Sequence, residues 1–284
     1  MTHRAYGFTR LSAERGGLLS HAEIAAVRAA ADESASARAV RALDIDAETK
    51  RLQRLLGRYR AILKCYHDAV PLVRALLGLH EIENVKLGWR AVARRIPAER
   101  WTPLWRDLHE LARVSIDPFR NAHTLFDVVK NLDGTLFGGI ASDVYSAHAD
   151  DLASAELAFD RWASLQVVGE IEMLDGAETL AAEIAEALVR LRDDEIARRS
   201  SVYGLSQAAA EAARAYPRRR APADLQMLCR RAFRGQALRL APAIAYAALT
   251  ERDDRIARAL AERGADADLD PAVDRIVAWA GGTQ

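Results

Sequence analysis

The sequence has little of what builds disulfide frameworks, metal clusters or β-sheets. It holds only two cysteines, Cys65 and Cys229, and they lie far apart. Two isolated thiols supply neither a disulfide framework nor a metal cluster, so we expect a reducing compartment and two small buried apolar residues. Aromatic residues make up only 6% of the chain, β-branched residues are sparse, and Ala, Leu, Arg and Glu dominate. This composition favours helices over strands.

Long hydrophobic runs and an excess of one charge are also missing. No stretch of about 18 uncharged apolar residues occurs, and the closest approach, residues 238–249, is too short to span a bilayer. The N-terminal residues contain no apolar segment typical of a signal peptide, so we expect none. The 40 basic and 40 acidic residues cancel, which argues against a nucleic-acid-binding protein with a basic face. We therefore expect any membrane role to be peripheral.

Apolar residues recur at spacings of three and four, which predicts amphipathic helices. Proline, glycine and Asp-Gly steps divide the chain into about ten to twelve helices joined by short connections. Four apolar stripes stand out: Leu52, Leu55, Leu56, Tyr59, Ile62, Leu63 and Tyr66; Ala155, Ala158, Phe159, Trp162, Leu165 and Val168; Leu180, Ile184, Leu188 and Leu191; and Leu225, Leu228, Ala232 and Phe233. The pattern predicts an all-α protein, a helical bundle or array.

A weak internal repeat of about 110 residues accompanies the helical pattern. Arg58-Tyr59 and Arg161-Trp162 occupy equivalent points of two similar helices. A second element, an acidic lead-in followed by a helix with basic residues, occurs at Glu81–Ala91, Asp193–Gly204 and, less well matched, Thr250–Leu260. Acidic starts and basic ends also complement the dipole of any helix, so this pattern alone leaves both interpretations open.

Motifs for catalysis and cofactor binding are missing. The sequence has no HExxH, P-loop, GxSxG or strand-linked GxGxxG motif, and its seven histidines show no metal-ligand spacing. The acidic pairs at 193–194 and 253–254 are similar to the aspartate-rich helices of isoprenoid synthases. However, Ala197 and Ala257 occupy the last position of the DDxxD spacing that would place carboxylates on one helical face. We expect no enzymatic activity, metal or cofactor, with an isoprenoid-synthase-like enzyme as a minor alternative.

Three motifs occur in order along the chain. The first is an acidic, Asn-containing segment that leads into an arginine. The second is a G-T-x-aromatic-G segment followed by an E-x-x-x-D-R-aromatic helix, and the third is a late P-x-x-A-Y…E helix. Their residues are Glu83-Asn84-Val85 and Arg90; Gly134, Thr135, Phe137, Gly138 and Glu156 to Trp162; and Pro242, Ala245, Tyr246 and Glu251. The ordered set resembles the C subunit family of V-type and archaeal-type rotary ATPases, whose eukaryotic members are the d subunits.

The resemblance implies an all-α fold of three quasi-repeated helical lobes forming a funnel-like array, with approximate lobes at 1–110, 111–205 and 206–284. It implies a non-catalytic central-stalk subunit that couples a rotating shaft to a membrane proteolipid ring for proton or sodium transport. The expected partners are D/F-like shaft subunits and the ring. The isolated protein is expected to be monomeric, cytoplasmic and peripheral to the membrane, without nucleic acid. The alternative is an unrelated helical scaffold that binds a partner helix.

Charged residues of the repeated elements and of a basic connector between two prolines are the candidate partner contacts. They are Glu83, Lys86, Arg90, Arg198, Arg199, Arg218, Arg219 and Arg220. The connector arginines could meet an acidic partner or lipid headgroups, or could form a solvated loop. Glu83 and Arg90 could instead pair within a lobe. In the second and third copies Glu195 and approximately Ile256 replace the motif's asparagine, which leaves their detailed contacts open.

Overall fold

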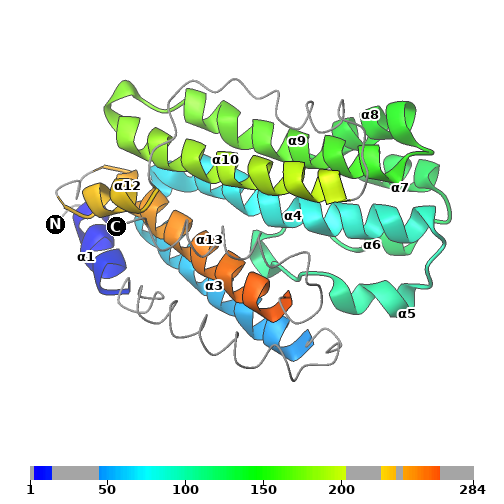
Figure 1. Ribbon diagram of the computed structural model, residues 1–284, viewed down its shortest axis with the longest axis horizontal. Helices are drawn as coiled ribbons and strands as arrows, with labels where there is room; N and C mark the ends of the chain where they lie inside the picture. The colour runs from blue at the N-terminus through cyan, green and yellow to red at the C-terminus, as the bar shows by residue number, and fades with distance from the viewer. Residues whose placement is uncertain (1–2, 15–44, 203–224, 235–238, 263–284) are drawn as a thin grey trace. The chain divides into compact units, whose positions relative to one another are not determined.

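The computed structural model describes residues 3–14, 45–202, 225–234 and 239–262 (Figure 1). Of these residues, 81% are helical and none forms a strand, which confirms the all-α prediction. No helix in the described ranges is both long and apolar enough to cross a bilayer.

The chain divides into two compact units, each assembled from segments that are distant in sequence. Unit 1 comprises Met1–Val70, Leu174–Ala187 and Pro222–Gln284, and unit 2 comprises Pro71–Met173 and Leu188–Ala221. The predicted lobes at 1–110, 111–205 and 206–284 follow the sequence consecutively, and they stay a prediction.

Unit 1 brings helices from both ends of the sequence into one core. Its helices are α1 (His3–Glu14), α3 (Ile45–Cys65), the first turns of α10 (Thr179–Val202), α12 (Leu225–Ala232) and α13 (Ala241–Glu262). Helices α3 and α13 lie side by side, and α1 packs against both (Figure 1). The stripe predicted for α3 is confirmed, with Leu55, Leu56 and Tyr59 buried.

Helix α13 is the central element of unit 1. Every residue from Ala241 to Arg252 is buried, and most of the first turns are alanines, which let neighbouring helices approach closely. The buried carboxylate of Glu178 accepts a hydrogen bond from the backbone N–H of Leu240 at 2.8 Å, just before α13 begins. Cys65 and Cys229 are buried in this unit and form no disulfide with each other, as predicted for two small apolar residues.

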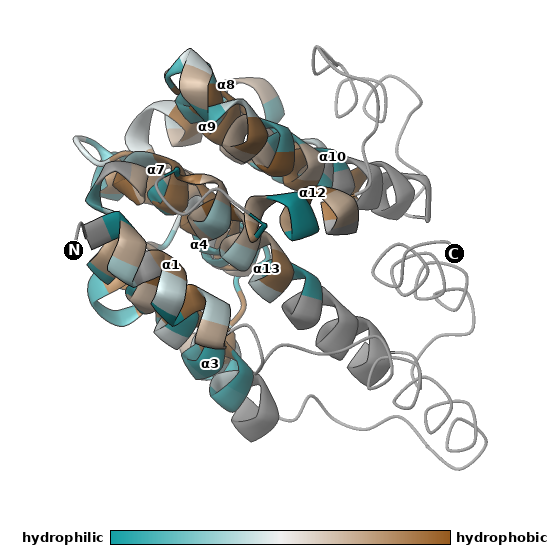
Figure 2. Ribbon diagram, turned by 90° about the vertical axis from the view of Figure 1, so that its left-hand side faces the viewer, coloured by the Kyte–Doolittle hydropathy of each residue, from teal (hydrophilic) through white to brown (hydrophobic). Residues whose placement is uncertain are grey.

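Unit 2 is built around α4. Its helices are α4 (Val70–Ala93), α5 (Ala98–Trp101), α6 (Asp117–Arg120), α7 (Leu125–Leu132), α8 (Gly138–His148), α9 (Leu152–Glu172) and the remainder of α10. From Leu72 onward α4 buries residues on almost all of its faces, so it is a core helix and not an amphipathic surface helix. Hydrophobic residues also run along much of α9 (Figure 2).

The buried face of α9 differs from the predicted stripe. Ala155, Phe159, Ala163 and Val167 are buried at successive spacings of four, whereas Leu165 is exposed. The prediction that Leu165 belongs to the core is therefore wrong. The predicted members Ala155 and Phe159 are buried, but the face also includes the buried Asp160, which an apolar stripe could not include.

Candidate functional site

The second half of the core helix α4 carries polar residues on two of its faces. Glu81, Asn84 and Gly88 are spaced by three and four residues and share one face, and Glu83, Lys86 and Arg90 share a neighbouring face. Because α4 is buried almost all round, both faces must find polar partners inside unit 2.

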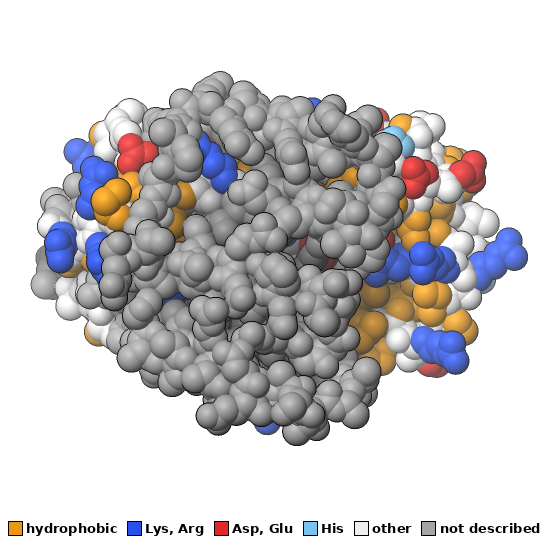
Figure 3. Space-filling model, viewed as in Figure 1, with side chains coloured by type: hydrophobic (Ala, Val, Ile, Leu, Met, Phe, Trp, Pro, Cys, Tyr) orange, Lys and Arg blue, Asp and Glu red, His pale blue; other side chains and the backbone are white. Residues whose placement is uncertain are grey.

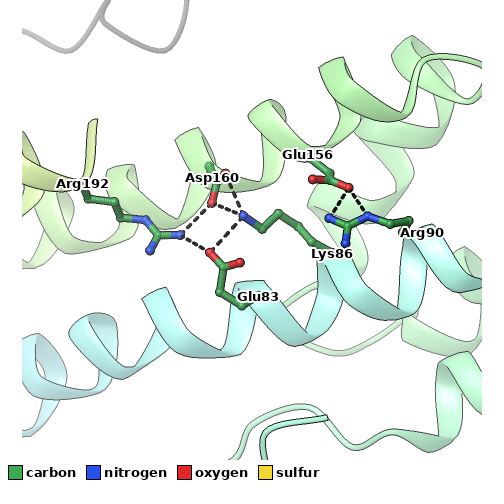
Figure 4. Close-up of polar contacts among 6 residues, drawn as sticks. All are labelled: Glu83, Lys86, Arg90, Glu156, Asp160 and Arg192. Atoms are coloured by element: carbon green, nitrogen blue, oxygen red, sulfur yellow. Dashed lines mark hydrogen bonds and ion pairs between the residues drawn. The ribbon is translucent and has the colours of Figure 1, made fainter. Parts of the chain in front are cut away.

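On the second of these faces, four charged side chains form a closed ring (Figure 4). Lys86 Nζ lies 2.8 Å from both carboxylate oxygens of Asp160 on α9 and 2.9 Å from Glu83 Oε1. Arg192 on α10 places its Nη2 2.7 Å from Asp160 Oδ1 and 3.2 Å from Glu83 Oε1. We call Glu83, Lys86, Asp160 and Arg192 the ion ring; it joins α4, α9 and α10.

The ring is balanced in charge and largely shielded from water. Lys86, Asp160 and Arg192 are buried, and only Glu83 keeps about a quarter of its side chain exposed. Burial alone would raise the pKa of Glu83, but the positive charges of Lys86, Arg192 and Arg106 together hold that pKa well below its usual range. Glu83 therefore stays ionised at neutral pH, and each carboxylate of the ring faces two cations.

A second ion pair extends this face by one turn of α4. Arg90 donates to Glu156 Oε1 on α9 from both Nε, at 2.7 Å, and Nη2, at 2.6 Å (Figure 4). Glu156 precedes Asp160 by four residues, so both acids project from one face of α9. On two successive turns, a basic residue of α4 thus pairs with an acidic residue of α9.

The other polar face of α4 holds the long connection between α5 and α7. The Asn84 amide donates to the backbone oxygen of Arg106 at 2.7 Å and accepts from its N–H at 2.9 Å, as a strand partner would. The buried Glu81 accepts from the backbone N–H of Arg113 and, at 2.6 Å, from its Nε. Gly88 lets the ring of Phe119 lie against the helix backbone, where a Cβ would collide with it.

These arrangements suit mechanical attachment better than proton transfer. A carboxylate with a lowered pKa is a weak base at neutral pH, and each cation of the ring already faces carboxylate oxygens. Among the described residues, no group of three or more His, Cys, Asp or Glu side chains could hold a metal ion.

The predicted partner-binding residues fall into three groups. Glu83, Lys86 and Arg90 lie on α4 and have the ion-pair partners described above; Glu83 and Arg90 do not pair with each other. Arg198 and Arg199 lie in α10, beyond the part whose side chains the structure describes. Residues 218–220 lie outside the described residues. Partner binding by all eight stays a prediction.

The late P-x-x-A-Y…E motif lies in unit 1, on α13, and contacts Tyr59 of the predicted repeat. Glu251 is buried on α13, and its Oε1 accepts a hydrogen bond from the Tyr59 hydroxyl of α3 at 2.6 Å. Tyr246, of the same motif, is buried as well. The motif therefore contributes to the contact between the first long helix of unit 1 and its central helix.

Arg192 and Asp160 were not among the predicted site residues, although the sequence carries a signal for both. The buried positions of α10 include Leu188, Arg192 and Ile196, a spacing of four in which a charge interrupts an apolar series. Asp160 interrupts the buried face of α9 in the same way. A basic and an acidic residue that each interrupt such a series are candidates for a buried ion pair.

Comparisons with known proteins find no relative: no family model, no curated protein and no solved structure matches the chain.

Proposed function

We propose that the chain is a non-catalytic central-stalk subunit of a rotary V- or A-type ATPase, coupling a rotating shaft to the membrane proteolipid ring during proton or sodium transport. The observation that supports this proposal is that two of the motifs on which the resemblance to that family rests supply opposite sides of the same contacts. Lys86 and Arg90, in the first motif segment, pair with Asp160 and Glu156 of the second. These two motif segments, which the sequence relates only by their order, therefore lie side by side in unit 2.

The geometry of these pairs also fits a subunit that transmits force. One helical turn advances 5.4 Å, so sliding α4 along α9 by a turn would bring one base opposite the acid of the other pair and leave the remaining base and acid without each other. A buried charge left without its partner costs several kcal/mol, which opposes such sliding. Two matched pairs between α4 and α9, with α10 held by Arg192, therefore fix the relative register of three helices. A coupling subunit without chemistry of its own needs this kind of stiffness.

The test is purification of the tagged full chain from membranes of its native cells, solubilised in a mild detergent. We expect shaft subunits, proteolipid subunits and nucleotide-binding subunits of one ATPase to co-purify and to be identified by mass spectrometry. Recovery of the chain with no other ATPase component would contradict the proposal. Recovery with a single unrelated helical protein would contradict it as well and would favour a helical scaffold.

The basic connector offers a variant that separates this proposal from nonspecific charge effects. Replacing Arg218, Arg219 and Arg220 by Glu is expected to reduce recovery of the other ATPase components, because these residues are predicted partner contacts. The matched control replaces the exposed Arg94, Arg95 and Arg100 of unit 2 by Glu, which changes the net charge equally. Equal losses in the two variants would refute a specific role for the connector.

A further inference from the structure

The hairpin formed by α7 and α8 presents large apolar side chains to solvent. Phe126, in the first turn of α7, is 58% exposed, and Leu136, in the turn before α8, is 44% exposed. The Tyr145 ring of α8 lies beside Phe126, with centroids 6.1 Å apart. The inner side of the hairpin is already packed through other residues, including the buried Val128 and Val144, so the exposed residues are not needed to attach it. Adjacent exposed apolar side chains of this size are typical of interaction surfaces.

The same hairpin is acidic. Between residues 121 and 155 the chain has five aspartates against one lysine, Lys130. Asp127 and Asp151 accept hydrogen bonds from the first turns of α7 and α9. The other aspartates, Asp133, Asp143 and Asp150, are exposed. Over α7 and α8, at the upper right of Figure 3, hydrophobic side chains stand beside acidic ones.

We propose that this surface, which we call the hairpin surface (Phe126, Leu136, Tyr145, Asp133 and Asp143), binds an amphipathic helix of a partner protein whose apolar stripe is flanked by Lys or Arg. Phe126, in the first turn of α7, and Leu136, in the turn that follows the helix, provide anchors for such a stripe, and the eight-residue α7, about 12 Å long, offers room for about two turns of a partner helix. The flanking cations would face the exposed aspartates, which adds attraction and sets orientation.

Charge argues against two other occupants. An anionic membrane surface would be repelled by the exposed aspartates. A second copy of this chain, related by a two-fold axis, would place the same acidic patch against itself. The hairpin surface shares no residue with the predicted partner contacts, so this inference stands apart from the proposed function and can fail without it.

The test measures binding of a fluorescein-labelled helical peptide of Leu and Lys to the full chain by fluorescence anisotropy. A peptide with Glu in place of Lys serves as the charge control. We expect the Leu/Lys peptide alone to bind, and Phe126→Ser or Leu136→Ser to weaken binding about tenfold through lost apolar burial. Asp133→Lys with Asp143→Lys should weaken it similarly. Leu165→Ser, at a comparably exposed leucine of α9 (42%), should leave it unchanged.

Several outcomes would overturn the inference. These are equal binding of both peptides, equal loss in Leu165→Ser, or no loss in Phe126→Ser. Binding to phosphatidylserine vesicles that Phe126→Ser abolishes would identify a membrane surface instead. A dimer in sedimentation that Phe126→Ser dissociates would identify a second copy. Because the substituted side chains are exposed, circular dichroism should show that every variant remains folded.

Discussion

Replacing Lys86 by Met should destabilise unit 2 strongly. Methionine preserves most of the apolar length of the side chain but removes the cation that faces both oxygens of Asp160 and one oxygen of Glu83. Arg192 would then be the one cation of the ion ring left for two carboxylates. Breaking a buried pair by removing one partner costs about 3–5 kcal/mol. Glu83 is partly exposed and water can reach it, so we expect the lower part of that range, about 3 kcal/mol.

Urea unfolding followed by tryptophan fluorescence measures this loss. Four of the five tryptophans, Trp89, Trp101, Trp105 and Trp162, lie in unit 2, so the signal reports mainly on that unit. The matched control is Lys64→Met on α3, where the same chemical change occurs at an exposed side chain. Its free energy of unfolding should stay within about 0.5 kcal/mol of the parent value.

The double variant Lys86→Met with Asp160→Leu provides the sharper test. It removes one cation and one anion, and Arg192 remains paired with Glu83 at 3.2 Å. The net charge of the ring returns to zero, so the double variant should be more stable than the sum of the two single losses predicts, by about 1–3 kcal/mol. Additive losses, or a Lys86→Met protein as stable as the Lys64→Met control, would refute the view that charge balance holds the three helices together.

Three further predictions concern other contacts. Gly88→Ala should lower the free energy of unfolding by about 1–3 kcal/mol and speed proteolysis between α5 and α7, because its methyl group would collide with the side chain of Phe119. Gly169→Ala, in open space on α9, should change neither quantity. Tyr59→Phe should cost about 1–2 kcal/mol in thermal unfolding through its lost hydrogen bond to α13, whereas the exposed Tyr6→Phe should be neutral. Because the pKa of Glu83 lies well below its ordinary value of 4.5, its ionised carboxylate stabilises the fold at pH values above 4.5. The free energy by which the parent protein is more stable than Glu83→Gln should therefore shrink in urea titrations as the pH falls below 4.5.

The helical class could be predicted from the sequence because the spacing of apolar residues and the composition both indicate helices, whichever elements later pack together. The stripe of α3 was predicted correctly since one face of that helix is apolar and the others are polar. Helix α9 has apolar residues on nearly every side, so periodicity could not select the buried face, and the choice that included Leu165 was wrong. The buried face includes Asp160, whose ion-pair partners Lys86 and Arg192 lie on other helices.

The ion ring could be predicted only in part. Glu83 and Lys86 were singled out because they belong to a charged segment of a predicted helix. Their partners on α9 and α10, Asp160 and Arg192, lie far along the chain, and sequence spacing carries no information on which distant acid meets which base. Arg192 was missed because basic residues in long helices are usually solvated, although it interrupts the apolar series of Leu188 and Ile196.

The composition of unit 1 has a consequence for the order in which the protein folds during synthesis. Helix α3 leaves the ribosome before unit 2, but α13, the helix that packs beside it, follows only after all of unit 2 has been made. Until then, among the described α-helices that precede unit 2 in the sequence, α1 is the one available to cover the apolar stripe of α3, with Leu55, Leu56 and Tyr59, whereas α4 can pair with α9 much sooner. Unit 2 is thus expected to fold first, and the nascent α3 is the segment most in need of a chaperone.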